Sequence, residues 1–75
     1  MDEGYILSNK FRRIIFESLV AGETNIDNIA KKHRIIPLVA RKVANDFTNG
    51  GIIEKKNNTY ILTSEGRKLA EKIIE

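Results

Sequence analysis

The chain has 75 residues and a net charge of +3; 41% of its residues are hydrophobic, 31% are charged and none is cysteine. This length leaves room for one small domain, which we expect to span residues 1–75, and the composition is typical of a globular chain. Without cysteine there is no disulfide or thiolate metal site, and the acidic start and lack of a long apolar run predict a cytoplasmic domain with no membrane partner.

A first helix is predicted at about residues 9–21, with Ser8 as its N-cap. Apolar side chains recur along it at helical spacing, and we expect four of them to be buried: Phe11, Ile14, Ile15 and Leu19. Gly22 then ends the helix, because glycine readily adopts the left-handed conformation found just past many helix ends.

A second helix is predicted at residues 26–33, after Asn25 as its N-cap. Its buried stripe is expected to consist of Ile26, Ile29 and Ala30. Lys31 and Lys32 fall on its outer face. His33 stands where the pattern expects an apolar residue, so we expect it to be a partly buried structural histidine rather than a ligand.

A third helix is predicted at residues 37–49, because proline is well tolerated in the first helical turn and Pro37 stands there. Ile36 precedes it and offers no side-chain cap. The inward stripe is expected to comprise Ala40, Val43, Ala44 and Phe47, with Val39 at its margin.

After Gly50 and Gly51, two runs rich in β-formers, 52–56 and 59–63, are predicted to form a hairpin around Asn57-Asn58. That turn pairs Lys55 with Tyr60 and Ile53 with Leu62. A last helix is predicted at 64–74, with a hydroxyl cap near Thr63-Ser64 and three buried residues, Leu69, Ala70 and Ile73. The order of elements predicts an α+β fold that is mostly α.

Charge is unevenly distributed along the chain. Residues 1–30 carry three cations and five acids, whereas residues 31–56 carry seven cations and two acids, a net charge of +5. A basic centre of this kind is typical of a surface that binds a polyanion, although a solvated surface on a basic protein has the same composition.

The outer face of the third helix carries the candidate base-reading side chains. At spacings of i, i+3, i+4 and i+7 lie Leu38, Arg41, Lys42 and Asn45. Arginine can pair bidentately with guanine and asparagine with adenine. The alternative is an ordinary solvated helix face; the preceding short turn and the following basic hairpin favour the binding interpretation.

The remaining candidate nucleic-acid-binding residues would contact phosphate. At the hairpin tip these are Lys55, Lys56, Asn57 and Asn58, and at the end of the second helix they are Lys31, Lys32 and Arg34. Lysines on a hairpin edge also discourage strand-to-strand aggregation, and both roles can hold together.

These segments resemble the winged helix-turn-helix domains of small prokaryotic, archaeal-style transcriptional regulators of the MarR and ArsR kind. The resemblance covers about residues 8–74 and is carried by Asn25 to Ala30, Val39 to Val43, Phe47, Gly51-Ile52-Ile53 and Tyr60 to Gly66. It implies a three-helix core and a C-terminal helix, a recognition helix at 37–49 in the major groove of double-stranded DNA, and a wing at 54–60. The sequence departs from the family pattern at Arg34, where glycine is common, at Ile36, where a hydroxyl cap is common, and at Leu38, where a small polar residue is common.

Other functions stay open at this point. Val39 to Lys42 followed by Gly51 to Ile53 also resembles the ribosomal protein S25 family, which implies RNA binding, and Leu38 beside a basic face is compatible with an acidic protein partner. Ile73 and Ile74 could support a homodimer through the last helix. We expect no enzymatic activity, cofactor or metal site, because no carboxylate pairs with a nucleophile or base and a single histidine cannot complete a metal site.

Overall fold

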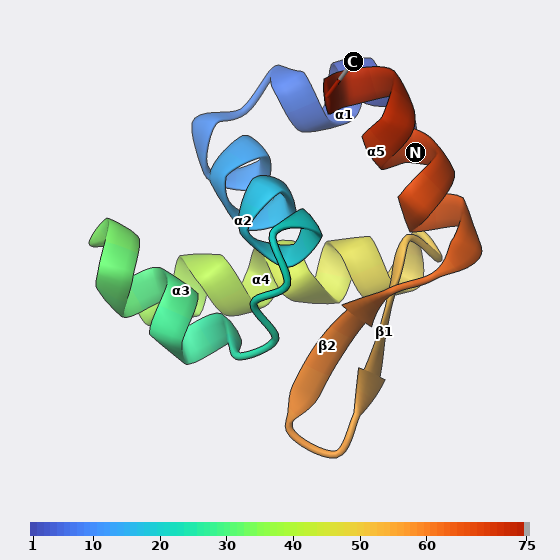
Figure 1. The fold of residues 1–75 in the computed structure, drawn as a ribbon. Helices are drawn as coiled ribbons and strands as arrows, with labels where there is room; N and C mark the ends of the chain where they lie inside the picture. Colours follow the sequence, from blue (N-terminus) through green and yellow to red (C-terminus); the bar gives the residue numbers. More distant parts are fainter. Residues whose placement is uncertain (75) are drawn as a thin grey trace.

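The computed structural model describes residues 1–74, with Ile74 described by its backbone alone. The fold is α+β and mostly helical, and Figure 1 shows its elements around a central helix, α4. In chain order they are α1 (Glu3–Leu7), α2 (Lys10–Val20), α3 (Ile26–His33), α4 (Pro37–Asn49), β1 (Ile53–Lys56), β2 (Thr59–Leu62) and α5 (Ser64–Ile74).

The two helices that carry most of the predicted site have the predicted bounds. In α3 the side chain of Asn25 accepts a hydrogen bond from the N–H of Asn28 at 2.9 Å, which satisfies one of the unpaired donors of the first turn. In α4 the residue before Pro37 is Ile36, and it provides no side-chain cap. Both features were predicted from the sequence.

The hairpin also has the predicted register, with Lys55 opposite Tyr60 and Ile53 opposite Leu62. Each strand is one residue shorter at its outer end than expected, because Ile52 and Thr63 lie outside the ladder. Of the two turn residues, only Asn57 has a positive φ, +57°, as in a turn of type II′.

Three consecutive helices end in the same way, with one left-handed residue followed by a hydrogen bond that spans the last turn. These left-handed residues are Gly22 after α2, Arg34 after α3 and Gly51 after α4. The next N–H in each case closes on a carbonyl five residues back, for example Ile35 on Ala30 at 2.8 Å and Ile52 on Phe47 at 3.1 Å. This is the Schellman arrangement, which glycine favours and which Arg34 adopts at φ +56°.

The core lies where α2, α3 and α4 meet and continues to the base of the hairpin and α5. Phe16 of α2 and Phe47 of α4 are both fully buried, and their rings meet edge to face with centroids 6.1 Å apart. The predicted inward face of α4 is buried as expected, and Val39 lies at its margin. In α5, Leu69 and Ala70 are buried, and Ile73 is half-buried rather than buried.

The N-terminal region differs from the prediction. Residues 3–7 form an additional helix, α1, whose N-cap is Asp2: its carboxylate accepts from the N–H of Tyr5 at 2.9 Å. The next helix therefore starts one residue later than expected, with Asn9 and not Ser8 as its cap. The Arg12 guanidinium fixes the two helices together by lying 3.8 Å from the centroid of the Tyr5 ring and donating to the Tyr5 carbonyl.

Some burial predictions for α2 and α3 were wrong. Phe11 is 38% exposed and Ile14 is half-buried rather than buried, and the buried aromatic residue of α2 is Phe16. The predicted face of α2 is otherwise retained, because Ile15 and Leu19 are buried; Phe11 lies in the first turn, at the end of that face. His33 is exposed rather than partly buried, and its Nε2 lies 3.4 Å from the Ser18 hydroxyl oxygen.

One main-chain contact and one side-chain contact fix the hairpin relative to the helices. The N–H of Tyr60 donates to the carbonyl of Thr24 at 2.9 Å, which attaches β2 to the segment just before α3. At the other end, the hydroxyl oxygen of Thr63 accepts from the N–H of Gly66 and caps α5, as the sequence predicted. The hairpin consequently projects beside the start of α3 while α5 turns back toward α1 (Figure 1).

The last helix, α5, packs against α1, so the N-terminus and the end of α5 lie on the side away from the hairpin tip (Figure 1). The predicted self-association surface includes Ile74, whose side chain lies outside the described residues. Within residues 1–74 no helix is both long enough and apolar enough to cross a bilayer.

Candidate functional site

The exposed face of α4 brings four predicted residues into one shallow hollow. Leu38, Arg41, Lys42 and Asn45 line it together with Val39 and Asp46. All four predicted residues are exposed, and Leu38 is 75% exposed. The opposite face of the helix is buried against α2 and α3, so these side chains stand on a rigid support.

A second hollow, of about 320 Å³, lies between the start of α3, the middle of α4 and the hairpin. Its lining comprises Asn25, Ile26, Asp27, Arg41, Lys55, Asn58 and Tyr60. Arg41 lines both hollows and therefore stands where the α4 face meets the hairpin. The contact between Tyr60 and Thr24 described above keeps the hairpin close enough to form this hollow.

Acidic side chains partner four of the predicted cations. The pairs are Arg41 with Asp27 at 3.2 Å, and Lys32 with Glu23, Lys42 with Asp46 and Lys56 with Glu54, each at 3.8 Å. The three lysine pairs are exposed single contacts that contribute about 0–1 kcal/mol each, so an incoming anion can replace the carboxylate at little cost, whereas Asp27 holds Arg41 through two atoms. These lysine side chains are therefore positioned by their acidic partners and remain able to bind another anion.

The hairpin contributes its residues unequally. Lys55 and Asn58 line the hollow next to Arg41, and the Lys55 ammonium lies 5.8 Å from the centroid of the Tyr60 ring. A cation near an aromatic face is weakly attracted to it, which holds the Lys55 side chain near its cross-strand partner Tyr60. Lys56 and Asn57 are exposed at the tip and line neither hollow.

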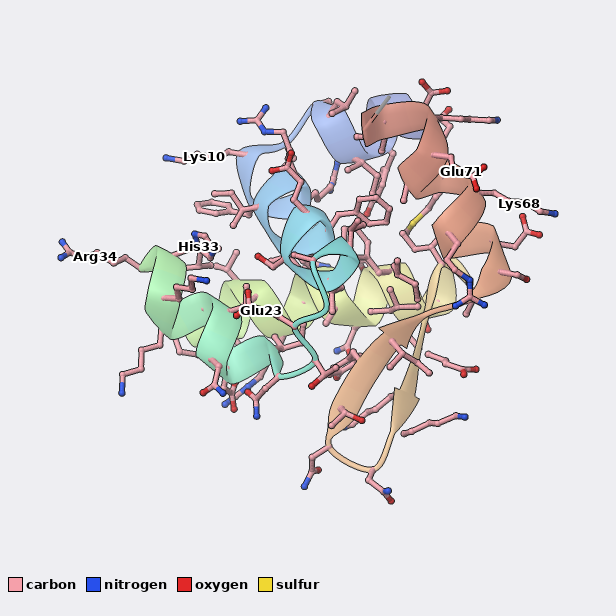
Figure 2. All side chains as sticks on the ribbon, in the orientation of Figure 1. Lys10, Glu23, His33, Arg34, Lys68 and Glu71 are labelled. Carbon is pink, nitrogen blue, oxygen red and sulfur yellow. The ribbon has the colours of Figure 1, made fainter. Side chains whose placement is uncertain are left out.

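The predicted residues of the α3 end are not brought into either hollow. Lys31 and Lys32 are exposed on the outer face of α3, as expected. Arg34 stands at the far end of that helix and points away from the hairpin (Figure 2). The cations predicted from the sequence therefore divide into a central group on α4 and β1 and an outlying group at the end of α3.

Asp27 and Tyr60 also line the hollow between α3, α4 and the hairpin, although neither was predicted from the sequence. Asp27 lies 14 residues before Arg41, and only the packing of α3 on α4 brings the two side chains into contact. The Lys42–Asp46 pair could have been found, because residues four apart on a helix are neighbours. A lone asparagine cap followed by an acid identifies a helix start but does not reveal a contact with the next helix.

The chemistry of this region is that of binding through hydrogen bonds and charge. Arginine, lysine and asparagine side chains present donors to acceptors such as phosphate oxygens and base edges. Within the part of the chain that the structure describes, no three His, Cys, Asp or Glu residues gather closely enough to hold a metal ion.

Comparison with known proteins returns no relative: no family model, no curated protein and no solved structure matches the chain.

Proposed function

We propose that the chain is a winged helix-turn-helix domain that binds double-stranded DNA and acts as a transcriptional regulator. In this proposal α4 is the recognition helix and enters the major groove, α3 braces it, and the β1–β2 hairpin is the wing, which contacts the backbone or the minor groove. The observation that carries it is the continuous exposed surface of α4 and the hairpin, with Arg41 at their junction.

The order and spacing of the elements support the proposal. A two-helix unit for the major groove needs a short connection that holds the second helix against the first, and residues 34–36 are the whole connection between α3 and α4. Ile35 within this connection is buried, so the turn is anchored in the core. The angle of α4 is then set by packing and does not depend on a flexible loop.

The side chains of the α4 face also suit the proposal. Arg41, Lys42 and Asn45 offer donors for base edges or phosphates, and the exposed Leu38 can contact a thymine methyl group. Lys55 and Lys56 extend the positive surface along the hairpin. Lys42 and Lys56 pair with acids through exposed single contacts, which exchange readily with phosphate.

A titration at several salt concentrations tests the proposal. The labelled protein is mixed with random-sequence duplex DNA, and binding is followed by fluorescence anisotropy and by amide chemical shifts. If about five phosphates are contacted, log K falls against log salt with a slope near −4 to −5. The expected amide shifts lie in α4 and the hairpin. A slope near zero, or shifts confined to α1 and α5, would overturn the proposal.

A second candidate is a protein-interaction domain, which is favoured by two exposed apolar side chains at the start of α4. Ile36 is 67% exposed and Leu38 is 75% exposed, and both lie beside the cations of α4. A partner with an apolar contact flanked by acids would fit that surface. The same titration with unlabelled duplex DNA, structured RNA and an acidic peptide as competitors distinguishes the candidates, since duplex DNA competes most effectively for a DNA-binding domain.

A further inference from the structure

The Arg41 guanidinium is held by a carboxylate from the neighbouring helix. Its Nε donates to Oδ1 of Asp27 at 3.2 Å, and its Nη2 donates to Oδ2 at 3.3 Å. This two-point contact fixes both the position and the plane of the guanidinium. Asp27 itself is placed by the first turn of α3, directly after the Asn25 cap.

The contact uses one edge of the guanidinium and leaves another edge available. Arginine has five N–H groups, and the side edge formed by Nε and Nη2 faces Asp27. Within residues 1–74, Arg41 donates no further hydrogen bond from its end edge, formed by Nη1 and Nη2. Two parallel donors of this kind match the O6 and N7 acceptors of guanine.

We infer that Asp27 is a positioning residue that holds Arg41 for reading one guanine. The inference rests on the proposed function. It assigns to Asp27 the role of making Arg41 specific for a base, where an unrestrained arginine would bind any phosphate. A lone arginine on a helix face can turn toward any nearby phosphate, whereas a guanidinium fixed at its side edge can offer only its end edge. The Asp27 carboxylate also repels the phosphates that would otherwise compete for Arg41.

A surface ion pair without this role has different consequences. If Asp27 only offset the charge of Arg41, removing its charge would raise affinity for every duplex equally. If Asp27 positions Arg41, the same change raises affinity for random duplex more than for the preferred sequence. The ratio of the two affinities therefore separates a positioning role from a merely electrostatic one.

The test starts from a selection of the preferred duplex out of a randomised library by the wild-type chain. Affinities for that duplex and for random duplex are then measured for the wild type and for Asp27→Asn, Arg41→Lys and Asp46→Asn. Asp46→Asn is the matched control, because Asp46 also pairs with a cation of the α4 face, Lys42 at 3.8 Å. Arg41→Lys keeps the charge and removes the two-donor edge.

The expected result is a preferred duplex with a guanine whose replacement weakens binding roughly tenfold. Asp27→Asn and Arg41→Lys both lower the affinity ratio by about that factor, and both lose the preference at that guanine. With Arg41 free to meet a phosphate, Asp27→Asn also steepens the salt slope by about 0.9. Asp46→Asn raises both affinities and leaves the ratio unchanged.

Two outcomes would overturn the inference while leaving the proposed function intact. The first is an unchanged ratio in Asp27→Asn, with a circular dichroism spectrum like that of the wild type. The second is a wild-type chain that binds random duplex with the expected salt slope but enriches no sequence. A chain that binds no duplex at any salt concentration overturns the proposed function as well, so the two failures are distinguishable.

Discussion

Gly66 packs against the main-chain carbonyl of Ile52 so closely that a β-carbon at this position would overlap the Ile52 oxygen. The contact joins the first turn of α5 to the segment between α4 and β1. Next to it, Thr63 donates from its N–H to that same carbonyl at 3.1 Å. The base of the hairpin is thus held by main-chain contacts that leave no room for a side chain.

Replacement of this glycine tests the contact. Gly66→Ala should lower the free energy of unfolding by about 2–3 kcal/mol, because the main chain must move to admit a methyl group. For a domain of this size that is a fall in melting temperature of roughly 8–24 °C. Thermal melts followed by circular dichroism measure it.

The matched control is Gly4→Ala in α1. A β-carbon there would meet Asp2 Oδ1 at 3.5 Å, an ordinary contact distance. Since alanine favours a helix over glycine by about 1 kcal/mol, we expect this change to be neutral or stabilising. Equal destabilisation by both changes would show that the Ile52 contact is not the cause.

The Thr63 hydroxyl joins the segment after α4 to the first turn of α5 and provides a second test. It donates to the Gly51 carbonyl at 2.6 Å and accepts from the N–H of Gly66 at 3.1 Å. Thr63→Val keeps the shape and removes both hydrogen bonds, which should cost about 1–3 kcal/mol of unfolding free energy. Thr63→Ser keeps the hydroxyl and should restore most of that stability in urea titrations. A valine variant as stable as the serine variant would contradict this account.

The elements that the sequence predicted correctly are those whose local signals agree with their packing. Asn25 and Pro37 mark helix starts, and the apolar residues that follow each of them recur at helical spacing, so the sequence predicted the bounds of α3 and α4 correctly. The two-residue turn at Asn57-Asn58 likewise determines the whole hairpin register. In these segments, residues close together in the sequence are enough to predict the helix bounds and the strand register.

The errors arise where a contact between distant residues decides the structure. Residues 3–7 form a helix shorter than two turns, which is unstable alone and depends on Arg12 and on packing against α5. For the same reason Arg41 could be predicted from the sequence as a candidate base-reading residue, whereas its partner Asp27, on the preceding helix, could not.

Arg34 permits a prediction about backbone strain. It occupies the left-handed region at φ +56°, in the position that glycine holds at the ends of α2 and α4. A residue with a β-carbon loses about 1–2 kcal/mol of stability in this conformation. Glycine avoids that strain, but it loses more conformational entropy on folding, which cancels part of the gain. Arg34→Gly should therefore raise the unfolding free energy by about 0.5–1 kcal/mol.

Arg34→Ala separates strain from charge in that experiment, because alanine removes the guanidinium but keeps the β-carbon. We expect its stability to stay close to that of the wild type in the same urea titration. If alanine stabilises the chain as much as glycine does, the gain comes from relief of charge repulsion near Lys31 and Lys32 and not from the backbone.

A pair of lysine variants locates the binding face without knowledge of a target sequence. Lys42 on α4 and Lys68 on α5 are 77% and 71% exposed and each pairs with an acid within one turn, Asp46 and Glu65. Figure 2 shows Lys68 on α5, away from the hairpin tip. Lys42→Glu and Lys68→Glu change the net charge equally and should cost similar, small amounts of stability.

Their effects on binding should nevertheless differ. If α4 carries the interface, Lys42→Glu replaces a phosphate contact by a repulsion, and affinity for random duplex should fall at least about tenfold with a salt slope shallower by about 0.9. Lys68→Glu should change affinity only through the long-range field, which salt near 0.15 M screens beyond about 8 Å. Equal losses in the two variants would mean that binding depends on net charge alone, and a larger loss at Lys68 would assign the interface to α5.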